Sequence, residues 1–140
     1  MRAIADQGFM RAFEWLNENR ERFRNVIEPA CFSVDVIDPV YSHAVESCIS
    51  VNAMKTFLFD NNEDYTKFNE YMDTKPYGEY RPHTWFRPKA EVEPPERSLD
   101  EIKAAGFDGY AIDFVQAPEF VKWFLMKQLD MHRVVGHIFI

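Results

Sequence analysis

The residues best suited to binding chemistry lie in the stretch KPYGEYRPHTWFRPK, residues 75–89. Four cations and one anion give it a charge of +3, so the remainder of a chain whose total is −7 carries −10. Cations hold phosphates while aromatic rings stack on bases, a combination typical of single-strand nucleic-acid binding. The alternative is an exposed loop whose rings pack inward and whose cations balance nearby acids. We predict contact with single-stranded DNA through Lys75, Tyr80, Arg81, Trp85, Arg87 and Lys89.

Two aspartates offer a second kind of chemistry, because Asp108 and Asp113 could form a pair for acid–base catalysis. They also flank an apolar segment as solvent-facing residues do, and no nucleophile or histidine accompanies them nearby. Catalysis needs a nucleophile, a base and an orienting group together. A small α/β enzyme acting through either aspartate is therefore the alternative, and a non-enzymatic interaction module is the interpretation that we favour. A stand-alone single-strand binder is a third interpretation, which the net charge opposes.

Metal and cofactor chemistry lacks a convincing pattern. The sequence contains no glycine-rich phosphate loop. The stretch DNNED, residues 60–64, resembles the start of a calcium loop, but Tyr65 and Tyr71 stand where that loop needs Gly and Glu. The four histidines and two cysteines are scattered, without the spacing of metal ligands. We therefore predict no metal, no cofactor and no small-molecule substrate.

The length, hydrophobic content and net charge of the chain indicate what kind of protein it is. A chain of 140 residues suits one domain, and its 46% hydrophobic and 16% aromatic content is ample for a packed core. The net charge of −7 opposes a broad DNA-binding face, so any nucleic-acid contact should be local. The longest apolar runs are too short to span a membrane, and the first residues lack the apolar core of a signal peptide.

Hydrophobic periodicity predicts strands that alternate with helices. The first segment is expected to be one amphipathic helix with an apolar stripe from Phe9 to Phe23. Residues 87–97 are rich in proline and charge and are predicted to be a loop. Further helices are expected at 38–49, 61–72, 98–106 and 117–129, and strands at 31–36, 54–60, 81–86, 110–114 and 132–140. This order predicts an α/β (α+β) fold, a mixed sheet layered with helices.

Several helix ends carry their own capping residues. Asp38 is expected to cap the helix that follows it. Ser98 and Glu101 have capping-box spacing, and Gly106 should end that helix in the left-handed conformation. The helix over residues 117–129 is apolar on most sides, so Trp123 should be largely buried along with its neighbour Phe124.

The last segment, HRVVGHIFI, residues 132–140, is apolar with little charge. We expect it to share a sheet with YAIDF, residues 110–114. An unprotected apolar edge recruits another strand, so this edge should pair with a partner, unless a helix of the same chain covers it. The predicted interface residues are Val134, Val135, Gly136, Ile138, Phe139 and Ile140.

Three segments, in this order, resemble the hinge region of structural-maintenance-of-chromosomes (SMC) proteins of the fifth type. They are AFEWLNENRERFRNVIEP at 12–29, YSHAVESCISVNAMKTFLFDNNEDYTKF at 41–68 and RSLDEIKAAGFDGYAIDFVQAPEFVKWFL at 97–125. The likeness spans almost the whole chain. Each segment alone is only moderately specific, but their common order is hard to obtain by chance.

The resemblance implies a function. SMC proteins fold back on an antiparallel coiled coil with an ATPase head at one end and the hinge at the other. The fifth-type hinge joins the hinge of the sixth-type protein, in a nuclear, chromosomal complex for DNA repair and recombination that contacts single-stranded DNA. The chain has no head motifs, so no ATPase activity is expected. Residues 1–27 would be the coiled-coil end and 28–140 the first hinge subdomain, with the second half-hinge apparently absent.

Overall fold

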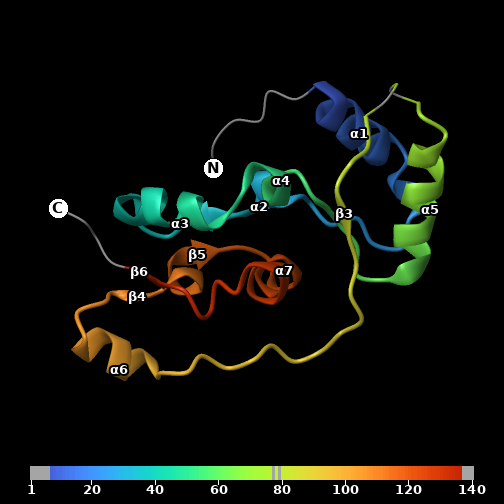
Figure 1. Cartoon of the computed structure of the whole chain (residues 1–140). Coiled ribbons are helices and arrows are strands. Elements are labelled where there is room, and N and C mark those ends of the chain that lie inside the picture. The colour runs from blue at the N-terminus through green and yellow to red at the C-terminus, as the bar shows by residue number, and fades with distance from the viewer. Residues whose placement is uncertain (1–6, 77, 79, 137–140) are drawn as a thin grey trace. The chain divides into compact units, whose positions relative to one another are not determined.

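A computed structural model describes residues 7–76, 78 and 80–136 of the chain (Figure 1). The chain divides into two compact units, and each unit is built from two stretches of sequence. Residues 7–32 and 51–89, with those gaps, form what we call the N-terminal unit. Residues 33–50 and 90–136 form the C-terminal unit. The chain therefore leaves the N-terminal unit after residue 32, returns to it at residue 51 and leaves it again after residue 89.

The N-terminal unit consists of short helices and one parallel pair of strands. Its elements are α1 (Gln7–Glu18), the 3-10 turn η1 (Arg20–Arg22), α2 (Ala30–Ser33, whose last residue lies in the other unit), α4 (Val51–Met54), β2 (Phe57–Leu58), α5 (Asn62–Asp73) and β3 (Thr84–Trp85). Strands β2 and β3 run parallel, with Phe57 opposite Thr84. The strands expected at 54–60 and 81–86 thus exist, but each is only two residues long.

The first helix places its apolar stripe inward, as predicted. Phe9, Ala12 and Leu16 are buried, because residues three and four apart share a helix face. The prediction of one helix reaching Phe23 is wrong. The Asn19 amide donates to the Trp15 carbonyl at 2.8 Å, a local side-chain bond that competes with helix continuation. Phe23 follows η1 and reaches the core from outside the helix.

Aromatic side chains dominate this core. Phe68 of α5 has its ring centroid 4.9 Å from that of Phe57 and 5.3 Å from that of Phe59. Phe9 of α1 lies 5.3 Å from Phe57, so three elements meet through rings. The buried residues of the cluster are Phe9, Ala12, Leu16, Phe23, Phe57, Phe59, Phe68 and Met72.

One buried carboxylate links the chain after η1 to the start of α5. Asp64 is fully buried and accepts hydrogen bonds from the backbone N–H groups of Arg24 at 2.9 Å and Asn25 at 3.0 Å. Asn61, the N-cap of α5, donates its amide to the same carboxylate at 2.9 Å. Burial raises the pKa of this carboxyl, but the hydrogen bonds to its charged form outweigh burial and lower the pKa overall.

The C-terminal unit contains helices and two antiparallel strand pairs. Its elements are β1 (Asp35–Val36), η2 (Pro39–Tyr41), α3 (Ser42–Cys48), α6 (Leu99–Ala104), β4 (Gly109–Tyr110), η3 (Ala111–Phe114), β5 (Val115–Gln116), α7 (Glu119–Leu129) and β6 (Val135–Gly136). β1 pairs with β5, and β4 pairs with β6. The predicted α/β (α+β) class is confirmed, although the strands of the described residues form three separate two-stranded ladders.

The capping predictions are confirmed in this unit. Asp38 accepts the Val40 N–H at 3.1 Å at the start of η2, which leads into α3. Ser98 accepts the Glu101 N–H at 3.2 Å at the start of α6. Gly106 follows α6 with a φ of +99°, a conformation that side chains with a Cβ rarely adopt. The loop predicted for residues 87–97 is also confirmed, since no helix or strand is present there.

Two predicted strands are wrong over most of their length. In the segment 110–114, the Asp113 carboxylate accepts the Tyr110 N–H at 2.8 Å, and the turn η3 forms in place of a strand. In the segment 31–36, the Phe32 N–H bonds the Pro29 carbonyl at 2.9 Å and residues 30–33 are helical. Phe32, which lies in this helical turn, is 48% exposed.

The burial prediction for α7 is confirmed for one residue and only partly for the other. Phe124 is 1% exposed, whereas Trp123 is only half-buried. The indole of Trp123 reaches a main-chain carbonyl at 3.1 Å, so its ring lies nearer the surface than the apolar pattern predicts.

Candidate functional site

The ladder formed by β4 and β6 is the first candidate interface. Gly109 lies opposite Gly136 and Tyr110 lies opposite Val135. The bond from the Ala111 N–H to the Val134 carbonyl, at 2.7 Å, extends the pairing. The prediction that residues 110–114 and the last segment share a sheet is therefore confirmed, and among the described residues the strand pairing joins Gly109 and Tyr110 to Val135 and Gly136.

The apolar side chains beside this ladder are accessible. Val134 is 39% exposed and Val135 is 38% exposed. Both line an open hollow of about 500 Å³, together with Glu96, Arg97, Ile102, Phe107, Tyr110, Asp130 and Arg133. Apolar and charged side chains thus share this surface, as they do in protein–protein interfaces. Three predicted interface residues, Ile138, Phe139 and Ile140, lie outside the described residues.

The cations of residues 75–89 lie at the surface of the N-terminal unit. Lys75, Arg81, Arg87 and Lys89 are all exposed. Arg81 donates to the carbonyl of Tyr80 at 3.0 Å, and Arg87 donates to the carbonyl of Phe86 at 2.8 Å. Neither of these bonds neutralises a charge, so both guanidinium groups can still attract phosphate.

The two predicted DNA-stacking rings of the same segment, Tyr80 and Trp85, pack against the N-terminal unit. Trp85 is 4% exposed within β3, and Arg87 lies over its ring, 5.7 Å from the centroid. The Tyr80 ring lies so close to α1 that a Cβ added at Gly8 would be 2.7 Å from it. A ring in the core cannot stack on a base, so the DNA-binding prediction for this segment now depends on its cations.

Of the two candidate aspartates, Asp113 has a structural partner. The Asp113 carboxylate serves the η3 turn by accepting the Tyr110 N–H. Among the described residues, no three His, Cys, Asp or Glu side chains gather as metal ligands. The described helices are also all too short or too polar to cross a lipid bilayer.

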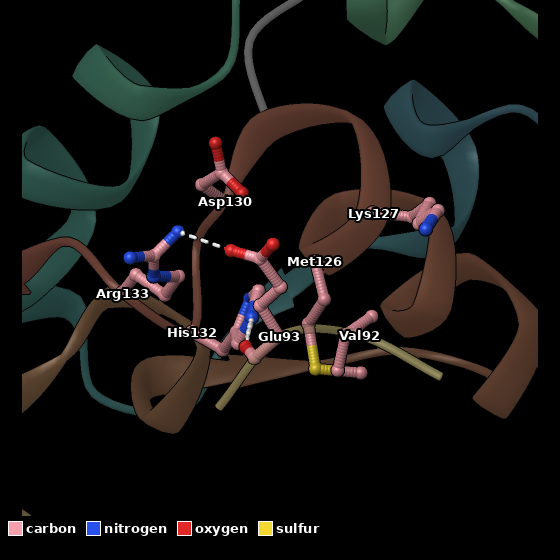
Figure 2. Close-up of a pocket in the computed structure, with 7 residues that line it drawn as sticks. All are labelled: Val92, Glu93, Met126, Lys127, Asp130, His132 and Arg133. Atoms are coloured by element: carbon pink, nitrogen blue, oxygen red, sulfur yellow. Dashed lines mark hydrogen bonds and ion pairs between the residues drawn. The ribbon is translucent and has the colours of Figure 1, made fainter. Parts of the chain in front are cut away.

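Sequence reasoning missed one set of contacts. Side chains of the C-terminal unit hold the loop of residues 90–97 by bonding its main-chain carbonyls and its acids. Figure 2 shows the central part, where His132 and Arg133 meet Glu93 beside a hollow of about 290 Å³. The partners lie 13 to 40 residues apart in sequence, so no local pattern marks them.

Comparison with known proteins gives similar curated sequences and similar solved structures. Structural maintenance of chromosomes protein 5 of Schizosaccharomyces pombe is 28% identical over 99 residues, which are 67% of this chain and 9% of that protein. The crystal structure of the S. pombe Smc5/6 hinge domain matches with a TM-score of 0.82 over 95% of this chain and 49% of that chain, at 22% identity. The chain has the fold of an SMC hinge domain.

Bacterial and archaeal hinge domains have the same fold. The asymmetric dimer of the Geobacillus stearothermophilus SMC hinge domain matches with a TM-score of 0.58, at 19% identity, over 93% of this chain and 48% of that chain. The Pyrococcus furiosus SMC hinge domain matches with a TM-score of 0.58, at 16% identity, over 92% of this chain and 70% of that chain. No protein-family profile matches the chain.

These matches confirm the resemblance to the fifth-type SMC hinge. They also agree with the expectation of a non-catalytic module, because the solved structures that match are hinge domains. The chain spans about a tenth of the curated relative and about half of the S. pombe hinge structure. The division at residue 27 between a coiled-coil end and a hinge subdomain stays a prediction.

Proposed function

We propose that this chain is a hinge module of a fifth-type SMC protein and dimerises with the hinge of a sixth-type SMC protein. The observation that supports this most strongly is the agreement of two comparisons, since the sequence match is to Smc5 of S. pombe and the highest TM-score quoted above is to the Smc5/6 hinge domain of the same organism. In this proposal residues 1–27 are the end of the coiled coil and residues 28–140 are the hinge subdomain.

The dimer contact is proposed at the β4–β6 ladder. Val134 and Val135 are exposed apolar residues at a strand that pairs on one side with β4. Such an edge recruits a further strand. Gly136 allows close approach of another backbone, and Ile138, Phe139 and Ile140 would continue the same contact.

A cellular role follows from the dimer. The chain would act in the nucleus, on chromosomes, in a complex for DNA repair and recombination. Single-stranded DNA would contact the N-terminal unit at its exposed cations, Lys75, Arg81, Arg87 and Lys89. The net charge of −7 confines this contact to the basic segment.

Light scattering of the chain alone, and mixed with a sixth-type SMC hinge, tests the dimer. We expect a one-to-one complex that Val135→Asp prevents, because a charge at the buried core of an interface is left unpaired. Glu70→Gln, an exposed residue of α5, is the matched control and should pair normally. Two folded proteins that stay separate at micromolar concentration would contradict the proposal.

A further inference from the structure

Residues 90–97, AEVEPPER, lead from β3 towards α6 and belong to the C-terminal unit; we call them the strap. Side chains of that unit hold the strap at three of its carbonyls and at two of its carboxylates. The bonds are Trp123 Nε1 to the Ala90 carbonyl (3.1 Å), His132 Nε2 to the Glu93 carbonyl (2.5 Å), the Tyr110 hydroxyl to the Arg97 carbonyl (2.5 Å), and Arg133 to Glu93 (3.1 Å) and Glu96 (3.8 Å).

The first part of the strap, residues 90–95, has a spacing of three residues, whereas the last bonded carbonyl, that of Arg97, lies four residues after Glu93. The bonded carbonyls of Ala90 and Glu93 are three apart. Val92 and Pro95 are half-buried and also three apart, whereas the residues between and beside them are exposed. Three residues per turn is the period of the polyproline II helix, which the pair Pro94–Pro95 favours.

The hydrogen bonding of the strap agrees with this conformation. No helix, strand or turn is present from residue 86 to residue 95. Within the described part of the chain, no backbone N–H of residues 90–97 donates a hydrogen bond. A strand in a ladder would use its N–H groups, whereas a polyproline II helix is held from outside through its carbonyls and side chains.

The side chains that hold the strap have the chemistry of a polyproline II binding groove. In such grooves aromatic side chains contact the ligand, and Trp and Tyr offer an apolar ring with a polar donor at its edge. Trp123 and Tyr110 supply these donors here, and His132, only 8% exposed, supplies a third. Val92 enters the wall of the hollow beside Met126 (Figure 2).

The charged side chains around the strap indicate that the site prefers an acidic ligand. Arg133 contacts two strap acids, and Lys127 lines the same hollow as Glu93, although Asp130 lies there as well. We propose that this face of the C-terminal unit is a recognition site for an acidic, proline-containing segment in the polyproline II conformation. The strap occupies the site in cis, and a partner segment of the same chemistry competes for it.

A labelled peptide with the sequence of residues 88–98 tests the site on the full chain. The tethered strap has a high effective concentration, so the unmodified chain should bind the peptide weakly. Glu93→Arg with Glu96→Arg repels the strap from Arg133 and leaves the donors unchanged. Fluorescence anisotropy should then show at least tenfold tighter peptide binding than for the unmodified chain.

Further variants identify the contacts. Adding Trp123→Phe removes one donor and should weaken peptide binding about threefold to tenfold, the effect of one hydrogen bond. Lys103→Gln, on the exposed side of α6, is the control and should change nothing. A peptide with glycine in place of Pro94 and Pro95 should bind poorly. Equal binding of the proline and glycine peptides, or no binding to the charge-reversed chain, would overturn the proposal.

A second measurement needs no charge reversal. The indole N–H resonance of Trp123, assigned by its loss in Trp123→Phe, is followed while millimolar unlabelled peptide is added to the unmodified chain. Replacement of the strap by the peptide should shift this resonance and leave those of Trp15 and Trp85 in place. If it does not move at saturating peptide, the site does not accept a segment in trans.

Discussion

The two units are stabilised in different ways. In the N-terminal unit, rings from α1, β2 and α5 pack against one another at tilted angles, and Phe9, Phe57 and Phe68 have no exposed surface. The C-terminal unit has a largely aliphatic core, and its loops are positioned by directed bonds such as Asp113 to Tyr110 and His132 to Glu93. Burial tolerates small changes in geometry, whereas hydrogen bonds at turns do not, so the interaction surfaces of the C-terminal unit depend on single polar atoms.

Core truncation should have the largest effect and should be similar in both units. Phe68→Ala and Phe124→Ala each remove a ring that is at most 1% exposed, and each should lower the free energy of unfolding by about 3–5 kcal/mol. Urea titration followed by circular dichroism measures the loss. Phe32→Ala, at 48% exposure, should cost less than about 1 kcal/mol. A larger cost for Phe32→Ala than for Phe68→Ala would refute the assigned core.

Removal of the buried Asp64 carboxylate tests whether the stability of the N-terminal unit also depends on specific hydrogen bonds. Asp64→Ala leaves the N–H groups of Arg24 and Asn25 without their acceptor and should cost about 1.5–3 kcal/mol. The same urea titration gives the value. Asp60→Ala removes an exposed carboxylate that contacts only side-chain amides and should cost much less. Similar costs for the two variants would show that the aromatic core alone fixes this turn.

Lowering the pH should weaken the hydrogen bonds that the Asp64 carboxylate accepts. Because the folded-state pKa of Asp64 is lowered, its contribution to stability is complete above the unfolded-state pKa of about 3.9. The contribution is lost as the pH falls further, through the folded-state pKa. The difference in stability between the natural chain and Asp64→Asn should therefore be constant near neutral pH and shrink below about pH 4. A difference that grows on acidification has the wrong sign for this mechanism.

Charge removal at the basic segment should have the smallest effect, and on binding alone. Arg81→Gln with Arg87→Gln should reduce the salt dependence of single-stranded DNA binding by roughly 0.7 per lost phosphate contact. A titration at several salt concentrations measures this slope. Trp85→Phe should leave binding unchanged because the ring is buried. A strong loss of binding in Trp85→Phe, with the melting temperature preserved, would restore the stacking role predicted for this residue.

Helices and their caps could be predicted from the sequence, because the information is local. Asp38, Ser98 and Gly106 act within four residues of their own positions, and the Phe9 stripe needs only helical periodicity. The strands could not be predicted at their true length. Over the described part of the chain each ladder is two residues long, and local bonds to Asp113 and Pro29 replace the extension expected at 110–114 and 31–36.

The candidate sites were predictable in part for the same reason. The basic segment and the apolar Val134–Val135 pair can be recognised from the types of residue alone, and the structure places both at the surface. Whether Trp85 faces outward depends on β2, whose residues lie 27 positions earlier in the chain, and composition cannot show this. The contacts of the strap are equally distant, since Trp123 and Ala90 are 33 residues apart.

The interleaving of the two units has a consequence for protein synthesis. Residues 33–50 leave the ribosome before residues 51–89, yet they belong to the unit that is completed by residues 90–136. During translation the N-terminal unit can fold first, once residue 89 has left the ribosome. At that stage β1 and α3 have been synthesised, but β5, the strand with which β1 pairs, has not. A chain that ends near residue 90 would therefore contain the complete N-terminal unit and, as an insertion in it, residues 33–50 without the rest of their own unit. Because each unit is built from two separate stretches of sequence, neither can be produced as one continuous fragment.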